Sequence, residues 1–159
     1  MVTGGGGILG RVEKSIEIKA PPEKVWKMLA LDRLPEWMKE LKSVKYTSEV
    51  STHEDKYRVG ATAHITEQHE EFDVEATENL KNEKITYHSK GPLSRSGNVT
   101  LVLTYTLEPV EAGTKLTFVD NYEMPWGILG KVLEKLFVQR MGEKEVERSL
   151  ETLKSILEK

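Results

Sequence analysis

The sequence predicts an α+β fold in which a curved antiparallel sheet of about seven strands wraps around one long C-terminal helix. From Leu41 to about Tyr122 the chain is a series of strand-like segments with short connections, which is typical of an antiparallel meander. After Pro125, apolar residues recur at helical spacing to about residue 157. A helix over residues 128–157 would be roughly 45 Å long and could span the sheet. The apolar faces of the sheet and helix then cover one another.

The N-terminus precedes this fold with a run of glycines. Gly5, Gly7 and Gly10 match the letters of a dinucleotide-binding motif, but that motif needs a buried strand before it and a helix after it. Neither is indicated here. We therefore expect residues 1–10 to form a flexible tail and residues 11–159 to form one folded domain.

A first strand and two short helices are expected to follow. Apolar and polar residues alternate over residues 11–19, with Lys14 interrupting the apolar face, and two prolines at 21–22 end the strand. A short helix then carries Trp26, and residues 32–38 form a second one that carries Trp37. Both tryptophans are expected to anchor the core.

Six further strands are expected, with breaks near residues 51–56, 67–70, 79–83, 91–97 and 109–114. Alternation with a period of two marks a sheet with one apolar and one solvated face. The inward-facing residues on this basis are Ala61, Ala63, Ile65, Phe72, Val74, Ala76, Val99, Leu101, Leu103, Tyr105, Leu107, Leu116, Phe118, Asp120 and Tyr122.

Composition excludes several classes of function. The net charge is −3, which argues against nucleic-acid binding. The chain has no Cys, and no apolar segment reaches the roughly 18 residues that a membrane span requires. No secretory signal is evident, so we expect a cytoplasmic protein with no stable membrane insertion.

No cofactor or metal is indicated. The four histidines, His53, His64, His69 and His88, include no helical pair at the spacing that a hydrolytic zinc site uses. Neither a G-x-S-x-G motif nor a phosphate-binding loop occurs. We expect no catalytic constellation, although Asp120, Glu67, Tyr87, Tyr105 and Arg140 are conceivable acids and bases of a pocket.

Small residues in the third strand raise the question of a hollow interior. Two of its three inward positions are Ala61 and Ala63. Because protein interiors are normally filled, small side chains here leave either a ligand cavity or a close helix approach. Concave clefts between sheet and helix commonly hold ligands, which favours the cavity.

The terminal helix carries two apolar stripes. Leu133 and Phe137 belong to the first stripe, and Leu150 and Leu153 to the second, which is rotated by about a quarter turn. Gly142 lies between them. Either a kink at Gly142 resets the phase, or a straight helix follows a curved sheet. In both cases the first half faces the cavity.

Charged residues are also expected at the interior. Arg140 continues the first stripe, with Met141 at its flank, and Asp120 continues the inward side of the seventh strand. An inward carboxylate and guanidinium can pair, as a polar anchor for a ligand with an acidic or carbonyl group or as a structural ion pair. A bulge could also turn Asp120 outward. Trp126, at the turn into the helix, either gates the cavity mouth or packs on the first helical turn.

Three segments resemble the START/polyketide-cyclase superfamily, whose fold is called the helix grip. They are Ile16-Glu17-Ile18-Lys19-Ala20-Pro21-Pro22-Glu23-Lys24-Val25-Trp26, Pro35-Glu36-Trp37-Met38 and Val59-Gly60-Ala61-Thr62. The terminal helix, from Pro125-Trp126-Gly127 through Leu150, Leu153 and Lys154, is similar to the polyketide-cyclase/coenzyme-Q-binding branch. The resemblance covers residues 11–159 and implies a ligand-binding domain of the order β-α-α-β6-α.

The resemblance leaves the function open, because one fold hosts many functions. It implies first a binding or carrier protein for a small hydrophobic molecule such as a lipid, a quinone or an aromatic polyketide. A cyclase/dehydrase enzyme and a protein-interaction module like the chaperone activators are the alternatives. The residues expected to contact a ligand are Ala61, Ala63, Ile65, Phe72, Val74, Tyr87, Leu101, Leu103, Tyr105, Phe118, Asp120, Tyr122, Trp126, Leu133, Phe137, Arg140 and Met141.

Overall fold

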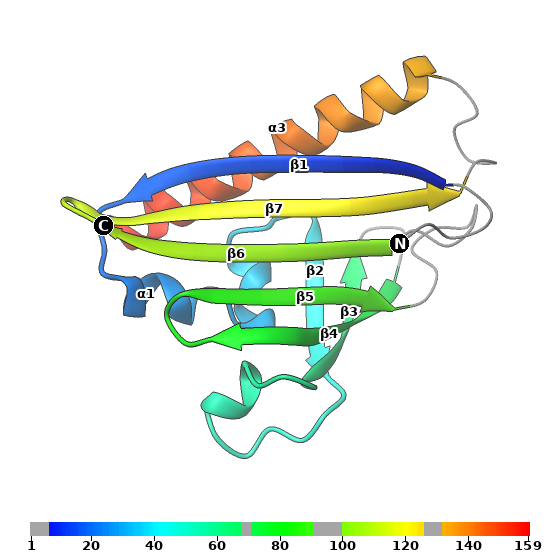
Figure 1. Cartoon of the computed structure of the whole chain (residues 1–159). Coiled ribbons are helices and arrows are strands. Elements are labelled where there is room, and N and C mark those ends of the chain that lie inside the picture. Colours follow the sequence, from blue (N-terminus) through cyan, green and yellow to red (C-terminus); the bar gives the residue numbers. More distant parts are fainter. Residues whose placement is uncertain (1–6, 68–70, 91–99, 126–131) are drawn as a thin grey trace.

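The sheet has seven antiparallel strands, as the alternation predicts. The computed structural model describes residues 7–67, 71–90, 100–125 and 132–159, and within its last helix the side chains of residues 132–141 are outside that description (Figure 1). The strands are β1 (Gly7–Ile18), β2 (Leu41–Tyr46), β3 (Thr62–Glu67), β4 (Glu71–Leu80), β5 (Lys84–Lys90), β6 (Thr100–Val110) and β7 (Gly113–Pro125). Their order in the sheet is β1-β7-β6-β5-β4-β3-β2.

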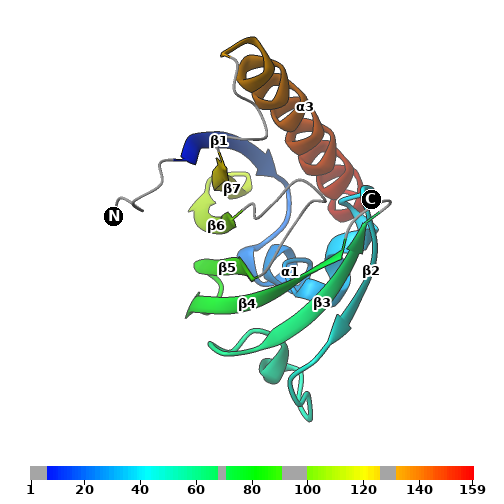
Figure 2. The same cartoon turned by 90° about the vertical axis from the view of Figure 1, so that its right-hand side faces the viewer.

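Three helices lie in the expected places, and the 3-10 helix η2 (Glu54–Lys56) lies in a segment that was expected to be a break between strands. The three are α1 (Pro22–Lys27), the 3-10 helix η1 (Leu31–Glu36) and the terminal helix α3 (Val132–Leu157). The second short helix, predicted over residues 32–38, is thus a single tight 3-10 segment with Pro35 inside it. Figure 2 shows the sheet curving strongly, with α1 inside the curve and α3 running alongside β1. The predicted α+β helix-grip architecture is confirmed.

The first strand begins earlier than the alternation indicated. It starts at Gly7, so residues 7–10, which were expected in a tail, pair with the end of β7. Gly10 lies opposite Tyr122, and a Cβ at this position would overlap the Tyr122 ring. The glycine therefore makes room for an aromatic ring across the sheet. Residues 1–6 lie outside the described residues.

Lys14, which interrupts the apolar face of β1, has a partner on α3. Its Nζ lies 2.8 Å from an Oε atom of Glu147. The ion pair joins the edge strand to the terminal helix, and Lys154 adds a second link by donating to the backbone carbonyl of Glu17 at 2.7 Å. The inward direction of Lys14 is therefore compatible with packing of α3 on β1.

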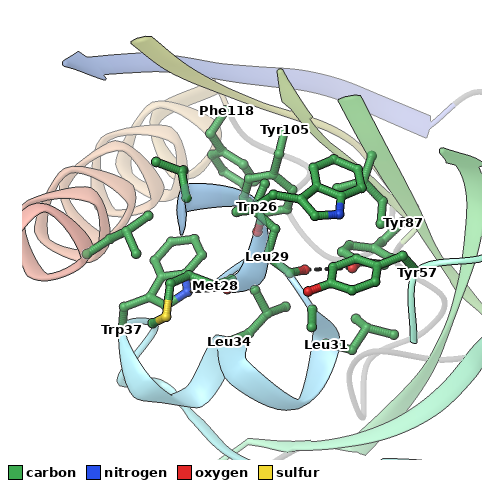
Figure 3. Close-up of a cluster of buried hydrophobic side chains, with 14 of the residues drawn as sticks. Trp26, Met28, Leu29, Leu31, Leu34, Trp37, Tyr57, Tyr87, Tyr105 and Phe118 are labelled. Atoms are coloured by element: carbon green, nitrogen blue, oxygen red, sulfur yellow. Dashed lines mark hydrogen bonds between the residues drawn. The ribbon is translucent and has the colours of Figure 1, made fainter. Parts of the chain in front are cut away.

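Aromatic side chains satisfy the backbone carbonyls at the end of α1. The last carbonyls of a helix lack partners within it, and here three consecutive ones accept hydrogen bonds from side chains that lie further along the chain. Figure 3 shows the donors Trp37, Tyr57 and Tyr87 around Met28 and Leu29. The pairs are Tyr57 to Lys27 (3.3 Å), Trp37 to Met28 (2.9 Å) and Tyr87 to Leu29 (2.6 Å). These bonds fix α1 inside the sheet and give buried polar atoms their partners.

The core is dense around these bonds. Trp26 stacks on Tyr57 with ring centroids 5.3 Å apart, and Tyr105 contacts Phe118 at 4.8 Å and Trp37 at 6.0 Å. Both tryptophans are buried, so their prediction as core anchors is confirmed. The part of the interior beneath α1 is thus closely filled.

Candidate functional site

A hollow remains at the other end of the interior, between the sheet, η1 and α3. It has a volume of about 240 Å³, and we call it the inner cavity. A water molecule occupies about 30 Å³ of liquid, so the volume of the cavity is several times that of one or two water molecules. A cavity of about 150 Å³ takes one benzene ring, and scaling from it gives room here for about ten non-hydrogen atoms.

The strands supply one wall of the inner cavity. Eight of the residues expected to contact a ligand lie there, and they occupy inward positions on five strands, β3 to β7. They are Ile65, Phe72, Val74, Tyr87, Leu101, Leu103, Phe118 and Asp120. Period-two alternation found all of them except Tyr87, because it states directly which side of a strand faces inward.

Other expected residues lie elsewhere. Ala61 and Ala63 are completely buried in the same cluster as Leu29, Leu31 and Tyr57, and they are not among the residues of the cavity wall. The two alanines therefore belong to the buried core and not to the described cavity wall. Tyr105 and Tyr122 are also buried, and they are not among the residues of the described cavity wall, although Tyr105 contacts Phe118 of that wall.

Five expected residues cannot be placed. Trp126 lies outside the described residues, and so do the side chains of Leu133, Phe137, Arg140 and Met141, although the last four belong to α3. The expected pairing of Arg140 with Asp120 therefore stays a prediction. Helix α3 itself runs without interruption from Val132 through Gly142 to Leu157.

The sequence analysis missed the wall that faces the strands. It consists of residues from η1, the segment between η1 and β2, the start of β2, the end of β3 and the middle of α3, namely Leu31, Leu34, Met38, Glu40, Leu41, Glu67, Gly142, Glu145 and Val146. Of these, the sequence had indicated only Glu67, as a conceivable acid or base of a pocket. The apolar face of the second short helix, with Leu34 and Met38, was a usable signal.

Asp120 is the most unusual residue of the inner cavity. It lies on β7 between Leu103 of β6 and Val12 of β1, so both of its cross-strand neighbours are apolar. Its Oδ1 atom is buried and has no hydrogen-bond partner among the described residues. Burial without compensation disfavours the charged form, and it raises the pKa of Asp120 from 3.8 to about 7.

The remaining charges at the cavity wall are of the same sign. Glu40, Glu67 and Glu145 join Asp120, and the described wall contains no Lys, Arg or His. Burial raises the pKa of Glu40, and the nearby Glu145 carboxylate raises it further. The described wall is therefore apolar with acidic groups, and it contains no described group that would attract an anion.

Glu40 and Glu145 also border a second hollow. This outer groove, of about 730 Å³, runs between the end of η1 and the outward side of α3. Its wall is mostly polar and includes Lys39, Lys144 and Arg148. Because the two hollows share Glu40 and Glu145, the inner cavity adjoins the surface at this pair.

Neither a metal centre nor a membrane span is evident in the described parts of the chain. No three His, Asp or Glu side chains there are grouped so that they could hold a metal ion. Among the same residues, no helix has the length and apolar character to cross a membrane.

Comparisons with known proteins give a consistent result for the fold. Residues 10–158 match the family described as polyketide cyclase/dehydrase and lipid transport. None of the curated proteins matches the sequence.

Solved structures that are similar in fold share little sequence. An uncharacterized protein from Rhizobium leguminosarum has a TM-score of 0.72 at 17% identity, covering 96% of this chain and 97% of that one. The Aha1 dimer from Colwellia psychrerythraea gives 0.62 at 22% identity, with coverage of 94% and 96%. DynU16, from the dynemicin biosynthetic locus, gives 0.61 at 16% identity, covering 93% of this chain and 47% of that one. At these identities the likeness concerns the fold.

Proposed function

Because the chain belongs to the polyketide cyclase/dehydrase and lipid transport family, we propose that it binds a small hydrophobic molecule in the inner cavity. The observation that carries the proposal is the cavity itself, about 240 Å³ of space with a mainly apolar wall. Ligand sites are typically concave and apolar with few polar groups. A ligand is held there chiefly by removal of apolar surface from water, at about 25 cal/mol per Å².

The size of the cavity limits the ligand. Room for about ten non-hydrogen atoms suits one or two fused rings, or one end of a longer molecule whose remainder lies in the outer groove. Full enclosure of a long lipid tail would need a larger space. The proposal therefore favours a compact aromatic or alicyclic molecule over a complete lipid.

Two experiments test this proposal together. Mass spectrometry of an organic extract of the natively purified protein should show a bound apolar molecule. Leu103→Trp places an indole ring at the cavity wall and should weaken binding of an apolar probe such as indane at least tenfold, by blocking the space. Val102→Trp, the matched control, changes the next residue of β6, which is not in the cavity wall.

Two outcomes of these experiments would contradict the proposal. Absence of an extracted molecule together with no binding of indane would contradict the proposal. Equal loss of binding in Leu103→Trp and Val102→Trp would also contradict it, because the effect would then be one of general destabilisation and not of occupied space.

An enzyme of the cyclase/dehydrase kind is the second candidate, and one observation favours it. A carboxyl group with a pKa of about 7 at a cavity wall can act as a general acid or base near neutral pH. Asp120→Asn assayed against aromatic polyketide precursors tests this function. Turnover undiminished by the substitution would exclude Asp120 as the catalyst. The third candidate, a protein-interaction module, requires a filled interior, and the presence of the inner cavity is evidence against that function.

A further inference from the structure

The inner cavity has a defined size, and its wall contains one buried polar atom without a hydrogen-bond partner among the described residues. This atom is Oδ1 of Asp120. A carboxylate offers only acceptors, and a buried acceptor without a donor is costly. A ligand that brings a donor to this atom would remove that cost.

We propose that the inner cavity selects an apolar molecule whose polar end donates a hydrogen bond, an amine or a hydroxyl group, and that Asp120 accepts it. The inference rests on the proposed function and goes further by naming the chemistry of the ligand. It differs from the anchor for an acidic or carbonyl group that the sequence suggested. An acidic ligand would bring another negative charge to a wall that already carries Glu40, Glu67 and Glu145.

Geometry supports a donor end at Asp120 and an apolar body beside it. Phe118 precedes Asp120 by two residues on the same face of β7, and Leu103 lies opposite it on β6; both are part of the cavity wall. Phe72 and Val74 of β4 line the same hollow. A ligand that contacts these four side chains can place one polar atom against Oδ1 while its rings remain in apolar surroundings.

The protonation state of Asp120 adds a pH signature to this selectivity. Its pKa of about 7 means that the carboxylate, the better acceptor for an amine, forms fully only above neutral pH. Other ionisable groups around the cavity are Glu40, Glu67, Glu145, Tyr87, Tyr105 and Tyr122. Burial raises the pKa of all three tyrosines, so their phenols stay neutral between pH 5 and 8. The Glu143 carboxylate also raises the pKa of Tyr122. Lys14, on the neighbouring strand β1, forms its ion pair with Glu147. The Arg140 side chain lies outside the described residues.

Four probes with the same ring system test the inference: indane, 2-aminoindane, 2-indanol and indane-2-carboxylic acid. They have about nine to twelve non-hydrogen atoms, close to the capacity of about ten estimated for the inner cavity. Dissociation constants come from titrations followed by amide shifts in NMR spectra at pH 5 and pH 8. At pH 8 we expect the amine to bind about 10- to 100-fold more tightly than indane, the range for hydrogen bonds to charged groups. The alcohol should bind more tightly than indane as well, and the acid least tightly. The preference for the amine should shrink at pH 5.

Asp120→Asn should remove most of the advantage of the amine over indane, and with it the pH dependence of that advantage. Asp73→Asn, on the exposed face of β4, is the matched control, because it removes one negative charge away from the cavity. Arg140→Gln tests the competing anchor.

Each outcome decides between the proposals. Binding of indane without a preference for the amine or alcohol, or an Asp120→Asn variant that keeps the preference, would overturn the inference and leave the proposed function standing. Strongest binding of the acid that is lost in Arg140→Gln would establish the acidic-ligand anchor instead. If indane and all three derivatives fail to bind, the proposed function fails with the inference.

Discussion

Replacement of Asp120 should change the pH dependence of stability in a way that the burial of this one carboxyl group determines. Its pKa rises from 3.8 to about 7 on folding. Between these values the folded protein holds a proton that the unfolded chain has lost, so the free energy of unfolding falls as pH rises. The loss begins near pH 4 and is complete shortly above pH 7.

The size of the loss follows from the two values. At 1.36 kcal/mol per pH unit, the change from 3.8 to about 7 corresponds to about 4 kcal/mol in total. Roughly 1.5 kcal/mol of it has already developed at pH 5, where the unfolded carboxyl is mostly ionised. The remaining 2 to 3 kcal/mol, approximately, should appear between pH 5 and pH 8.

Urea unfolding of the wild type and Asp120→Asn at both pH values measures this difference. Asparagine has the same shape and no charge, so the variant should gain about 2 to 3 kcal/mol over the wild type on going from pH 5 to pH 8. Glu111→Gln, which removes one exposed carboxylate in the turn between β6 and β7, is the surface control and should show no such gain. A difference between wild type and Asp120→Asn that is the same at both pH values would refute the argument that the Asp120 carboxylate is buried without a partner.

His64 contributes a second, separable pH dependence. It contacts Glu71 and Asp73 at 2.9 Å each, and these hydrogen bonds raise its pKa. The stability that it confers is fully present below its unfolded pKa of about 6.5 and is lost as pH rises through its higher folded pKa. Both residues therefore lower stability toward alkaline pH in the wild type. Comparison of Asp120→Asn with the wild type cancels the contribution of His64, since both proteins contain it.

The remaining predictions concern single contacts, each measured as a change in the free energy of unfolding in urea. Gly142→Ala should stabilise the protein by up to about 1 kcal/mol, because the nearest atom among the described residues, Val12 Cγ2, lies 3.8 Å from the new Cβ; a destabilised variant would contradict the packing described. Gly10→Ala should destabilise by about 1 to 3 kcal/mol, since its Cβ overlaps the Tyr122 ring, and a neutral result would mean that residues 7–10 do not pair in the sheet. Tyr87→Phe leaves the Leu29 carbonyl without its donor and should cost about 1 to 3 kcal/mol, whereas an unchanged stability would show that water replaces the bond.

The strands and their inward faces could be predicted because alternation is a local property. A residue two positions from a buried neighbour on a strand faces the same side, so Phe72, Val74, Leu101 and Leu103 were placed correctly without knowledge of the fold. The same alternation also predicted that Asp120 faces inward, although charged residues are rarely found on the inward face of a sheet. The rule holds because the sheet lacks a bulge at that point of β7.

The other wall of the cavity could not be predicted in this way. Leu31 and Leu34 belong to a 3-10 helix of six residues, which is too short for its periodicity to specify a face. Its position depends on hydrogen bonds from Trp37 and Tyr87 to carbonyls just before it, and such contacts between distant segments leave no local pattern. Ala61 and Ala63 did not indicate the cavity, because both are buried in the core outside the described cavity wall.

The distribution of unfavourable features over the molecule supports a function for the inner cavity. The unpartnered oxygen of Asp120, the helix-interior Gly142 and the unfilled volume each lower stability, and all three occur at one place. Around α1, by contrast, consecutive carbonyls each have an aromatic donor, and the alanines are tightly covered. There the sequence gives these buried carbonyls hydrogen-bond partners. Natural proteins break such local rules of stability mainly at functional sites, so the unfavourable features of the cavity point to a function there. A ligand that fills the volume and donates to Asp120 would remove two of these three costs at once. Binding should therefore raise the stability of the wild type more than that of Asp120→Asn.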